Sequence, residues 1–267
     1  MDRYLSFISE SGIQKGDILD VSSDLKEIIL FCRRHNEIFD ANKVLDSLKE
    51  AVGNEGTLLI RAWNWDFCHN LGFDINKSAS QVGALGNIAM NRKDFMRTQH
   101  PIYSFMVWGK HAEKLVSLTN KSSFGSDSPF GFLTNNNGKQ FMYGSDMYNS
   151  LTYVHFVEEQ VGVHYRYLKD FTDKYVDKNG VCSIKTYSMN VRDLDLNIRM
   201  FSRKTAHLFQ QTFEDLFTTE GILKKSQHEN VFIGLLELKK AYRFIEDDIK
   251  NNRSKKICLY NDSREKQ

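Results

Sequence analysis

The sequence predicts an α/β fold: a three-layer α/β/α sandwich with a central mixed sheet and a C-terminal elaboration of helices and a hairpin. Three observations predict it. Short apolar segments typical of strands alternate with amphipathic helical segments, and no internal repeat or composition break divides the chain. The chain has 267 residues, of which 41% are hydrophobic, which is enough to bury a substantial core and excludes a disordered protein. We therefore expect a single domain over residues 1–267.

The first half of the chain supplies the alternation of strand and helix. Residues 16–21 are expected to form a strand that ends in Ser22-Ser23-Asp24. Apolar residues with helical spacing follow in residues 44–52, and Gly53 is expected to end that helix. The next expected elements are a strand at 57–60, a small helix at 83–90, a strand at 102–108, a helix at 110–118 and a strand at 140–144.

The second half is expected to add helices and a hairpin. A helix is predicted over 152–161, and residues 175–191 read as a β-hairpin turning at Lys178-Asn179-Gly180, because Asn-Gly supplies the positive φ of such turns. Two further helices are expected at 204–218 and 237–251, and the polar tail, 251–267, is expected to fray.

Composition and charge exclude several classes of function. The 36 Lys and Arg against 34 Asp and Glu leave a net charge of +2, without the basic surface of a non-specific nucleic-acid binder. The four cysteines are scattered, which favours free thiols in a reducing compartment. The N-terminus lacks a signal-peptide pattern, and no apolar run could span a bilayer. We expect a cytoplasmic protein without membrane partners.

The most informative stretch is Thr152-Tyr153-Val154-His155-Phe156-Val157-Glu158. On a helix, Thr152, His155 and Glu158 share one face, so a hydroxyl, an imidazole and a carboxylate line up. Such a set can work as a general-base dyad with a helper, in which the carboxylate fixes the tautomer of the imidazole. Spacing alone favours the alternative, a solvated helix face with a weak His-Glu pair. A zinc site is not expected, because the final His of an H-x-x-E-H pattern is missing.

Three other clusters are candidate binding residues. The segment from Arg97 to Ser104 carries hydrogen-bond donors on every second residue and leads into a strand. Arg97 can either pair with a phosphate or form a structural salt bridge. Trp63, Trp65 and Asp66 follow a strand where open α/β sheets bind ligands, although core packing by the two Trp is the equal alternative. The polar loop 122–131, which contains Asp127, can line a site or simply turn the chain.

Taken in order, these motifs resemble the aminoglycoside 3-N-acetyltransferase-like family. The resemblance covers residues 16–167 and weakens toward the C-terminus. It rests on Val21-Ser22-Ser23-Asp24-Leu25, Gly53-Asn54-Glu55-Gly56-Thr57-Leu58, Gly83, Arg97-Thr98-Gln99-His100-Pro101-Ile102-Tyr103-Ser104, Trp108-Gly109, Ser128-Pro129 and the T-x-x-H-x-x-E set of Thr152, His155 and Glu158.

The resemblance implies an acyltransferase that uses acetyl-CoA, needs no metal and acetylates an amine on a sugar-like ring. It implies His155 as the general base, Glu158 as its partner and Thr152 as a helper. Backbone N–H groups at Ser22, Ser23 and Asp24 are expected to bind the oxyanion. The pantetheine and phosphates are expected to pass Arg97, His100 and Ser104. Trp63, Trp65, Asp66 and Asp127 are the expected substrate-binding residues.

Two departures from the family's pattern bear on the acceptor. The usual His-Ser-Ser-Leu is here Ser22-Ser23-Asp24-Leu25, and Asn87 stands where an acidic residue is often found. With the basic residues Arg166, Lys169 and Arg192 after the dyad, they favour a nucleotide-linked amino sugar for surface-polysaccharide (O-antigen or capsule) biosynthesis. An aminoglycoside acceptor is the alternative, and a non-catalytic sugar- or nucleotide-binding protein is the alternative of another class. The aromatic content also allows a homodimer.

Overall fold

The computed structural model describes residues 2–196, 198–200, 214–254 and 260–262. Within them, a seven-stranded mixed sheet forms the centre of the molecule. Its strands, in spatial order, are β10 (Leu223–His228), β11 (Val231–Glu237), β6 (Lys139–Tyr143), β1 (Ile18–Ser23), β2 (Thr57–Arg61), β5 (Phe105–Gly109) and β4 (Met96–Arg97). β1 pairs in parallel with both β2 and β6, and the outer pairs are antiparallel.

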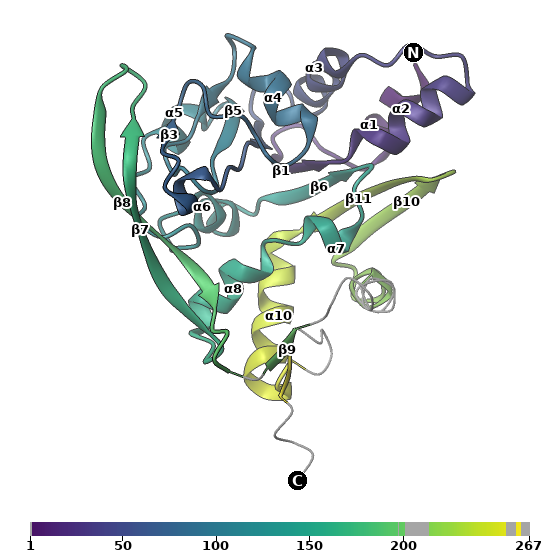
Figure 1. Cartoon of the computed structure of the whole chain (residues 1–267). Helices are drawn as coiled ribbons and strands as arrows, with labels where there is room; N and C mark the ends of the chain where they lie inside the picture. The colour runs from purple at the N-terminus through teal and green to yellow at the C-terminus, as the bar shows by residue number, and fades with distance from the viewer. Residues whose placement is uncertain (1, 197, 201–213, 255–259, 263–267) are drawn as a thin grey trace.

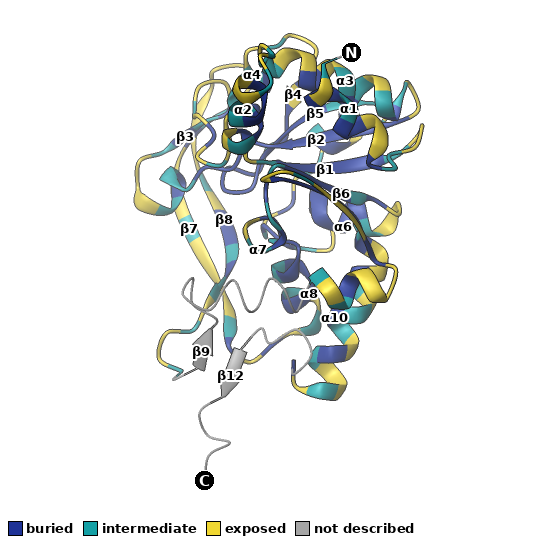
Figure 2. Ribbon diagram, turned by 90° about the vertical axis from the view of Figure 1, so that its right-hand side faces the viewer, coloured by how far each residue is buried: buried dark blue, intermediate teal, exposed yellow. Residues whose placement is uncertain are grey.

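Helices cover both faces of this sheet, so the predicted three-layer α/β/α architecture is confirmed (Figure 1, Figure 2). One face carries α1 (Arg3–Glu10), α2 (Leu25–Arg34), α3 (Ala41–Val52) and α4 (Ala84–Met90). The other carries α5 (Ala112–Val116), α6 (Pro129–Asn135), α7 (Met147–Ser150), α8 (Val154–Val161) and α10 (Leu238–Asn252).

The alternation of side chains along the strands separates two hydrophobic cores. Leu58 and Ile60 of β2 pack with α1–α4, whereas Leu59, between them, packs with α6, α8 and α10. This is the period of two expected for a strand buried on both faces. The sheet is therefore fixed from both sides, and the ends of its strands form a rigid platform.

A long hairpin, β7 (Arg166–Val176) and β8 (Cys182–Arg192), arches over one side of the molecule (Figure 1). Its tip pairs with β3 (Phe73–Asp74), and a 3-10 helix, η1 (Asp66–His69), lies between β2 and β3. Gly180 has φ 81° in the turn, as the Asn-Gly signal predicts. The hairpin begins nine residues earlier than expected, because most of β7 is exposed and shows little apolar alternation.

The C-terminal region agrees with the expectations in part. The helix expected at 237–251 is α10, but most of the helix expected at 204–218 lies outside the described residues. Within the tail expected to fray, β12 (Tyr260–Asp262) pairs with β9 (Ile198–Met200), and residues 255–259 and 263–267 lie outside the described residues.

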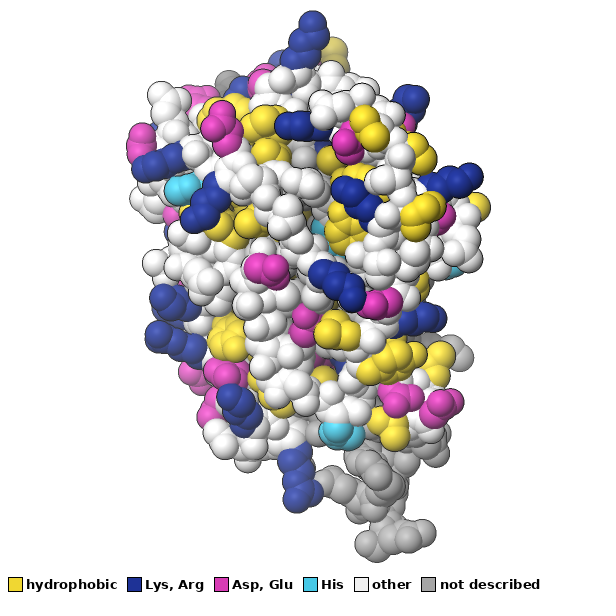
Figure 3. Space-filling view, turned by 90° about the vertical axis from the view of Figure 1, so that its left-hand side faces the viewer, with side chains coloured by type: hydrophobic (Ala, Val, Ile, Leu, Met, Phe, Trp, Pro, Cys, Tyr) yellow, Lys and Arg dark blue, Asp and Glu magenta, His cyan; other side chains and the backbone are white. Residues whose placement is uncertain are grey.

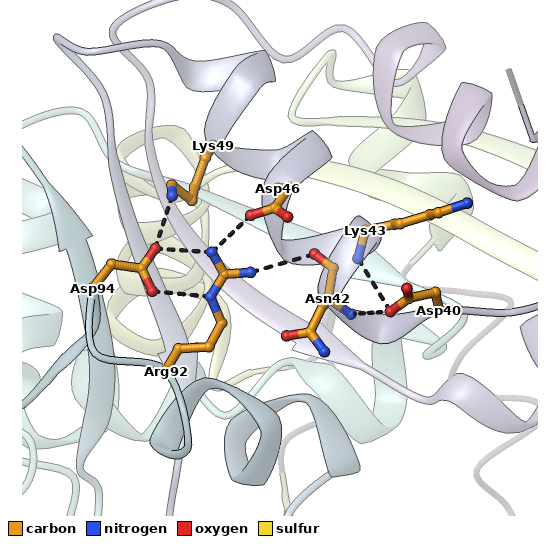
Figure 4. Close-up of polar contacts among 7 residues, drawn as sticks. All are labelled: Asp40, Asn42, Lys43, Asp46, Lys49, Arg92 and Asp94. Atoms are coloured by element: carbon orange, nitrogen blue, oxygen red, sulfur yellow. Dashed lines mark hydrogen bonds and ion pairs between the residues drawn. The ribbon is translucent and has the colours of Figure 1, made fainter.

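Polar contacts fix α3 at its N-terminus and near its middle (Figure 4). Asp40 caps the helix, since its carboxylate accepts hydrogen bonds from the backbone N–H groups of Asn42 at 2.8 Å and Lys43 at 3.4 Å. Arg92, which follows α4, pairs with Asp46 of α3 at 2.7 Å and with Asp94 at 2.9 Å. An ion pair thus ties α3 to the segment that follows α4 in the same layer.

The face that carries β7 and β8 shows Lys, Arg and acidic side chains interspersed, with small apolar patches between them (Figure 3). No helix in the described part of the chain combines the length and apolar character needed to cross a bilayer. Among the same residues, no group of three or more His, Cys, Asp or Glu could hold a metal ion.

Candidate active site

A histidine and a glutamate on the first turns of α8 form a hydrogen-bonded pair. His155 Nδ1 lies 2.7 Å from Glu158 Oε2, and the two residues are one helical turn apart. The Glu158 side chain is fully buried, whereas that of His155 is 30% exposed. Because an ionised carboxylate only accepts hydrogen bonds, Nδ1 must carry the proton. The second ring nitrogen, Nε2, then has a lone pair available for a reacting group.

Two more residues fix the Glu158 carboxylate from the chain that follows α8. The Tyr165 hydroxyl donates to Oε1 at 2.8 Å, and Arg166 Nε lies 2.6 Å from Oε2 as an ion pair. Burial raises the pKa of Glu158, but the hydrogen bond and charge of His155, the Arg166 charge and the Tyr165 hydroxyl outweigh it and lower that pKa. Glu158 is therefore ionised at neutral pH, although no part of its side chain meets water.

The α8 helix begins later than the sequence predicts. Thr152 and Tyr153 form a turn before it, in which the His155 N–H donates to the Thr152 carbonyl at 3.0 Å. The Thr152 side chain is partly exposed, and its hydroxyl makes no hydrogen bond within the described residues. The ring of Phe124 meets the His155 ring edge-on at 5.8 Å, so the loop before α6 borders the dyad.

A pocket of about 700 Å³ opens at the carboxyl ends of β1 and β2. Ser22, Ser23 and Asp24 form its floor together with the first turn of α2, and Gly83 and Ala84 at the start of α4 form another wall. A Cβ on Gly83 would lie 2.9 Å from the Ser23 carbonyl oxygen, so only glycine allows α4 to approach so closely. In the sheet, β1 lies between its parallel neighbours β6 and β2, so the chain continues to opposite sides of β1. The carboxyl ends of strands at such a topological switch point are the usual ligand position in open α/β sheets.

The pocket contains both cationic and unpartnered polar groups. Lys26 and Arg33 of α2 line it, and so does Arg61, whose guanidinium makes a bidentate pair with buried Asp20 at 2.7 and 2.8 Å. Ser22 and Trp63 also line it, and the atoms Ser22 Oγ and Trp63 Nε1 are buried without a hydrogen-bond partner among the described residues. Buried polar atoms in this state are rare in native proteins.

The comparisons with known proteins identify the family. The family model described as aminoglycoside 3-N-acetyltransferase matches residues 21–250. The chain belongs to the aminoglycoside 3-N-acetyltransferase family. The predictions of this family and of an N-acetyltransferase enzyme are therefore confirmed.

Solved structures share the fold of this acetyltransferase. Aminoglycoside acetyltransferase AAC(3)-Xa is 18% identical with a TM-score of 0.74, over 93% of this chain and 92% of that one. AAC-IIIb, in a binary structure with CoASH, is 17% identical with a TM-score of 0.73, over 93% and 95%. AAC-VIa bound to sisomicin is 15% identical with a TM-score of 0.73, over 93% and 96%.

Three residues expected to bind the cofactor lie in the interior of the acetyltransferase. Arg97 donates to Ser104 Oγ at 3.0 Å and to the carbonyls of Ala62 at 2.8 Å and Ser78 at 2.5 Å. His100 is 2% exposed, and burial lowers its pKa to about 4. None of the three lines the pocket at β1. Their polar groups are used to hold loops together, which is a structural role that spacing alone does not reveal.

Ser22 and Ser23, which end β1, and Asp24 after them all line the pocket, and the structure gives Asp24 a capping role. The Asp24 side chain caps α2 by accepting from the Lys26 N–H at 3.0 Å, and its own N–H donates to the Tyr143 carbonyl at 3.1 Å. The Asp24 N–H is therefore not available for an oxyanion. Ser22 and Ser23 remain as pocket residues.

The four expected substrate-binding residues are not all brought together. Trp63 lines the pocket and also packs edge-on against Tyr103 at 4.9 Å. Trp65 is partly buried, and Asp66 accepts hydrogen bonds from Gln81 at 2.8 Å and Asn64 at 3.1 Å. Asp127 is exposed in the loop before α6, and its charge acts on Glu159, next to the dyad glutamate. Of these four residues, Asp127 is the one with an exposed carboxylate on the α8 side.

The structure also assigns Arg166 differently from the sequence analysis. We expected Arg166 to meet a diphosphate, but it is only 10% exposed and its guanidinium pairs with Glu158. Tyr165 and Lys26 were not singled out at all. Gly162 ends α8, and the chain then turns back so that Tyr165 and Arg166 lie against Glu158. No motif in the sequence signals that return.

Proposed function

We propose that this enzyme transfers an acetyl group from acetyl-CoA to an amine of an aminoglycoside, with the whole chain acting as one N-acetyltransferase domain. The observation that carries the proposal is the His155–Glu158 pair, in which a buried ionised carboxylate leaves His155 Nε2 as a free base. Family membership supports the reaction class. The structural relatives that hold CoASH and sisomicin support this donor and this acceptor.

The chemistry of the dyad follows from the state of the acceptor. The acceptor reacts as the neutral amine, and its nitrogen gains positive charge as the C–N bond forms, so a base must take one proton from it at that step. The acetyl thioester supplies the activated acyl group. His155 Nε2 takes the proton as the new C–N bond forms and the C–S bond breaks, and it then returns the proton to the thiolate. Glu158 stabilises the transient imidazolium, while Tyr165 and Arg166 hold Glu158 in place.

The pocket at β1 and β2 fits the acyl donor. Lys26 and Arg33 provide positive charge, and the N-terminus of the ten-residue α2 adds partial positive charge at the same end. The walls nearer the sheet include Val21, Ile60 and Val82, which suit an aliphatic arm. With the Asp24 N–H engaged, the Thr152 hydroxyl is our candidate to stabilise the oxyanion.

Charges near the dyad favour an aminoglycoside over a nucleotide-linked amino sugar. Arg166, which we expected to bind a diphosphate, is neutralised by Glu158. On the acceptor side, Asp127 is exposed, and Glu159 is held by the Ser122 hydroxyl at 2.7 Å. Exposed carboxylates attract polycationic acceptors. The comparisons likewise support the aminoglycoside alternative rather than a role in polysaccharide biosynthesis. A homodimer stays a prediction.

The test is an assay of CoA release from acetyl-CoA, with sisomicin and a nucleotide-linked amino sugar as alternative acceptors. We expect turnover with sisomicin and little with the nucleotide sugar. The opposite result would restore the polysaccharide role. No CoA release with either acceptor, together with no binding of acetyl-CoA, would contradict the proposed function as a whole.

A further inference from the structure

Two smaller cavities adjoin each other where the edge strand β4, the segment after β3 and the tip of the β7–β8 hairpin meet. One has a volume of about 280 Å³ and the other of about 170 Å³. Both are lined by Ile75, Arg97, Val116 and Lys178, which makes them two halves of one site, here called the hairpin-tip site. It shares no lining residue with the pocket at β1 and β2 and does not include the dyad. The hairpin-tip site is therefore separate from the site of acetyl transfer.

Arg97 brings a buried positive charge to both halves of the hairpin-tip site. It is 9% exposed, and its guanidinium donates to neutral acceptors, namely the Ser104 hydroxyl and three backbone carbonyls. The carboxylate whose charge acts on it, Asp74, pairs with Lys77 at 3.6 Å. Burial accordingly lowers the pKa of Arg97 to about 10. Its hydrogen bonds are satisfied but its charge is not neutralised, so an anion beside it would relieve the cost of burying that charge.

Two lysines of the hairpin add positive charge at the smaller half. Lys178, in the turn, lines both halves, and Lys185 of β8 lines the smaller one, with its Nζ 4.2 Å from the Tyr175 ring centroid. Asp177 also lines the smaller half, but its carboxylate accepts two backbone N–H groups of the turn at 2.9 Å. The lining residues thus carry an excess of positive charge, which attracts an anion. A cavity of about 170 Å³ admits one small anionic group such as a carboxylate.

The larger half of the hairpin-tip site is mainly apolar. Besides the shared residues, it is lined by Asn76, Met90, Phe95, Met96 and Met106. Methionine side chains are flexible and polarisable, and they adapt to apolar ligands of different shapes. Met96 lies on the edge strand and is 40% exposed, so this half opens at the surface. An apolar cavity with a few charged groups at one end is the usual form of a small-molecule site.

We propose that the hairpin-tip site binds an amphiphilic anion, in which a single carboxylate is attached to an apolar chain or ring. The carboxylate lies near Arg97, Lys178 and Lys185, and the apolar part lies among the three methionines. The proposal goes beyond acetyl transfer and does not depend on it.

The test measures the binding of four probes to the purified protein by calorimetry. The probes are octanoate, octan-1-ol, acetate and octylamine, which vary the charge and the apolar chain separately. We expect octanoate to bind at one site. Octan-1-ol, which lacks the charge, should bind at least about 5-fold more weakly, and acetate should bind far more weakly still, because each buried CH₂ contributes about 0.8 kcal/mol. Octylamine, of the opposite charge, should not bind.

The variants change the rim of the site, because replacing Arg97 would also release the loops that it holds. Replacing Lys178→Gln and Lys185→Gln together should weaken octanoate binding about 5-fold and leave octan-1-ol unchanged. Met96→Asp, which puts a charge in the apolar half, should weaken both probes. Lys169→Gln is the matched control, because Lys169 also lies over a ring of the same hairpin, that of Phe171 at 5.3 Å, but lines neither half.

Four outcomes overturn the proposal. They are no binding of octanoate, binding of octan-1-ol as tight as that of octanoate, unchanged octanoate affinity in the double lysine variant, and an equal loss in the Lys169→Gln control. Arg33→Gln, in the pocket at β1 and β2, reports on binding at that other site. A loss of octanoate affinity in Arg33→Gln without one in the double lysine variant would place the anion there and contradict the assignment.

Discussion

Glu158 illustrates how a single buried charge is made tolerable and useful. Its carboxylate has no exposed surface but contacts a cation, an imidazole and a phenol, namely Arg166, His155 and Tyr165. Removing one partner of such a buried pair leaves an uncompensated charge, which is far more costly than the pair itself is stabilising. Arg166 is therefore expected to matter for folding as well as for the dyad.

Arg166→Met should lower the free energy of unfolding by about 3–5 kcal/mol at pH 7, since it leaves the Glu158 carboxylate without its cation. The loss should be smaller at pH 4. Glu158 has a lowered pKa in the native protein, so its contribution is present above the ordinary pKa and disappears as the pH falls. Urea unfolding at both pH values measures the difference, and an equal loss at pH 7 and pH 4 would contradict this role.

At the scale of elements, the N-cap of α3 supports the helical layer beside the pocket. Asp40→Ala removes the acceptor for the Asn42 and Lys43 N–H groups and should cost about 1 kcal/mol in the free energy of unfolding. Asp46→Ala is the matched control, because it removes one exposed carboxylate of the same helix that pairs with Arg92. It should cost about 0.5 kcal/mol or less. Equal costs for the two variants would argue against the cap.

The elements that could be predicted are those with a clear period or a strong stop signal. The α3 helix has its apolar residues at helical spacing and Gly53 at φ 66°, and α10 and β6 lie within a residue or two of the predictions. The α1 and α2 helices were missed, although each buries one apolar stripe, because they are short and interrupted by polar residues. The β10–β11 hairpin was missed too, since β10 is mostly exposed.

The candidate site could be predicted only where its residues are close in sequence. His155 and Glu158 are one turn apart and form the expected pair. Tyr165 and Arg166 reach Glu158 through the chain reversal at Gly162, and the pairing of β1 with β2 brings Ser22 and Trp63 to one pocket, which no local spacing encodes. Arg97 to Ser104 reads like a ligand-binding motif, yet its donors are satisfied by carbonyls from distant loops.

At the scale of the whole molecule, stability should depend on the protonation of His100. Burial lowers the pKa of His100 to about 4, below its ordinary value, so the folded protein resists protonating it. As the pH falls from about 6.5 to about 4, the unfolded chain binds that proton and the folded protein does not, which removes about 3 kcal/mol of stability. The loss should be largely complete by pH 4.

His100→Gln isolates this contribution, because glutamine keeps a donor and an acceptor but does not titrate. The difference between the two proteins in the free energy of unfolding should shift in favour of His100→Gln as the pH falls from 7 to 4. A difference that stays constant over this range would show that His100 is not held neutral by the fold.

The central claim is that His155 and Glu158 act as one catalytic unit. The measurement that tests it most directly is kcat/KM for acetylation of sisomicin by the unaltered enzyme, His155→Ala, Glu158→Gln and the double variant. We predict that His155→Ala loses about 10²- to 10⁴-fold and that adding Glu158→Gln causes little further loss. Losses that multiply, or a His155→Ala enzyme as active as the unaltered one, would contradict the account.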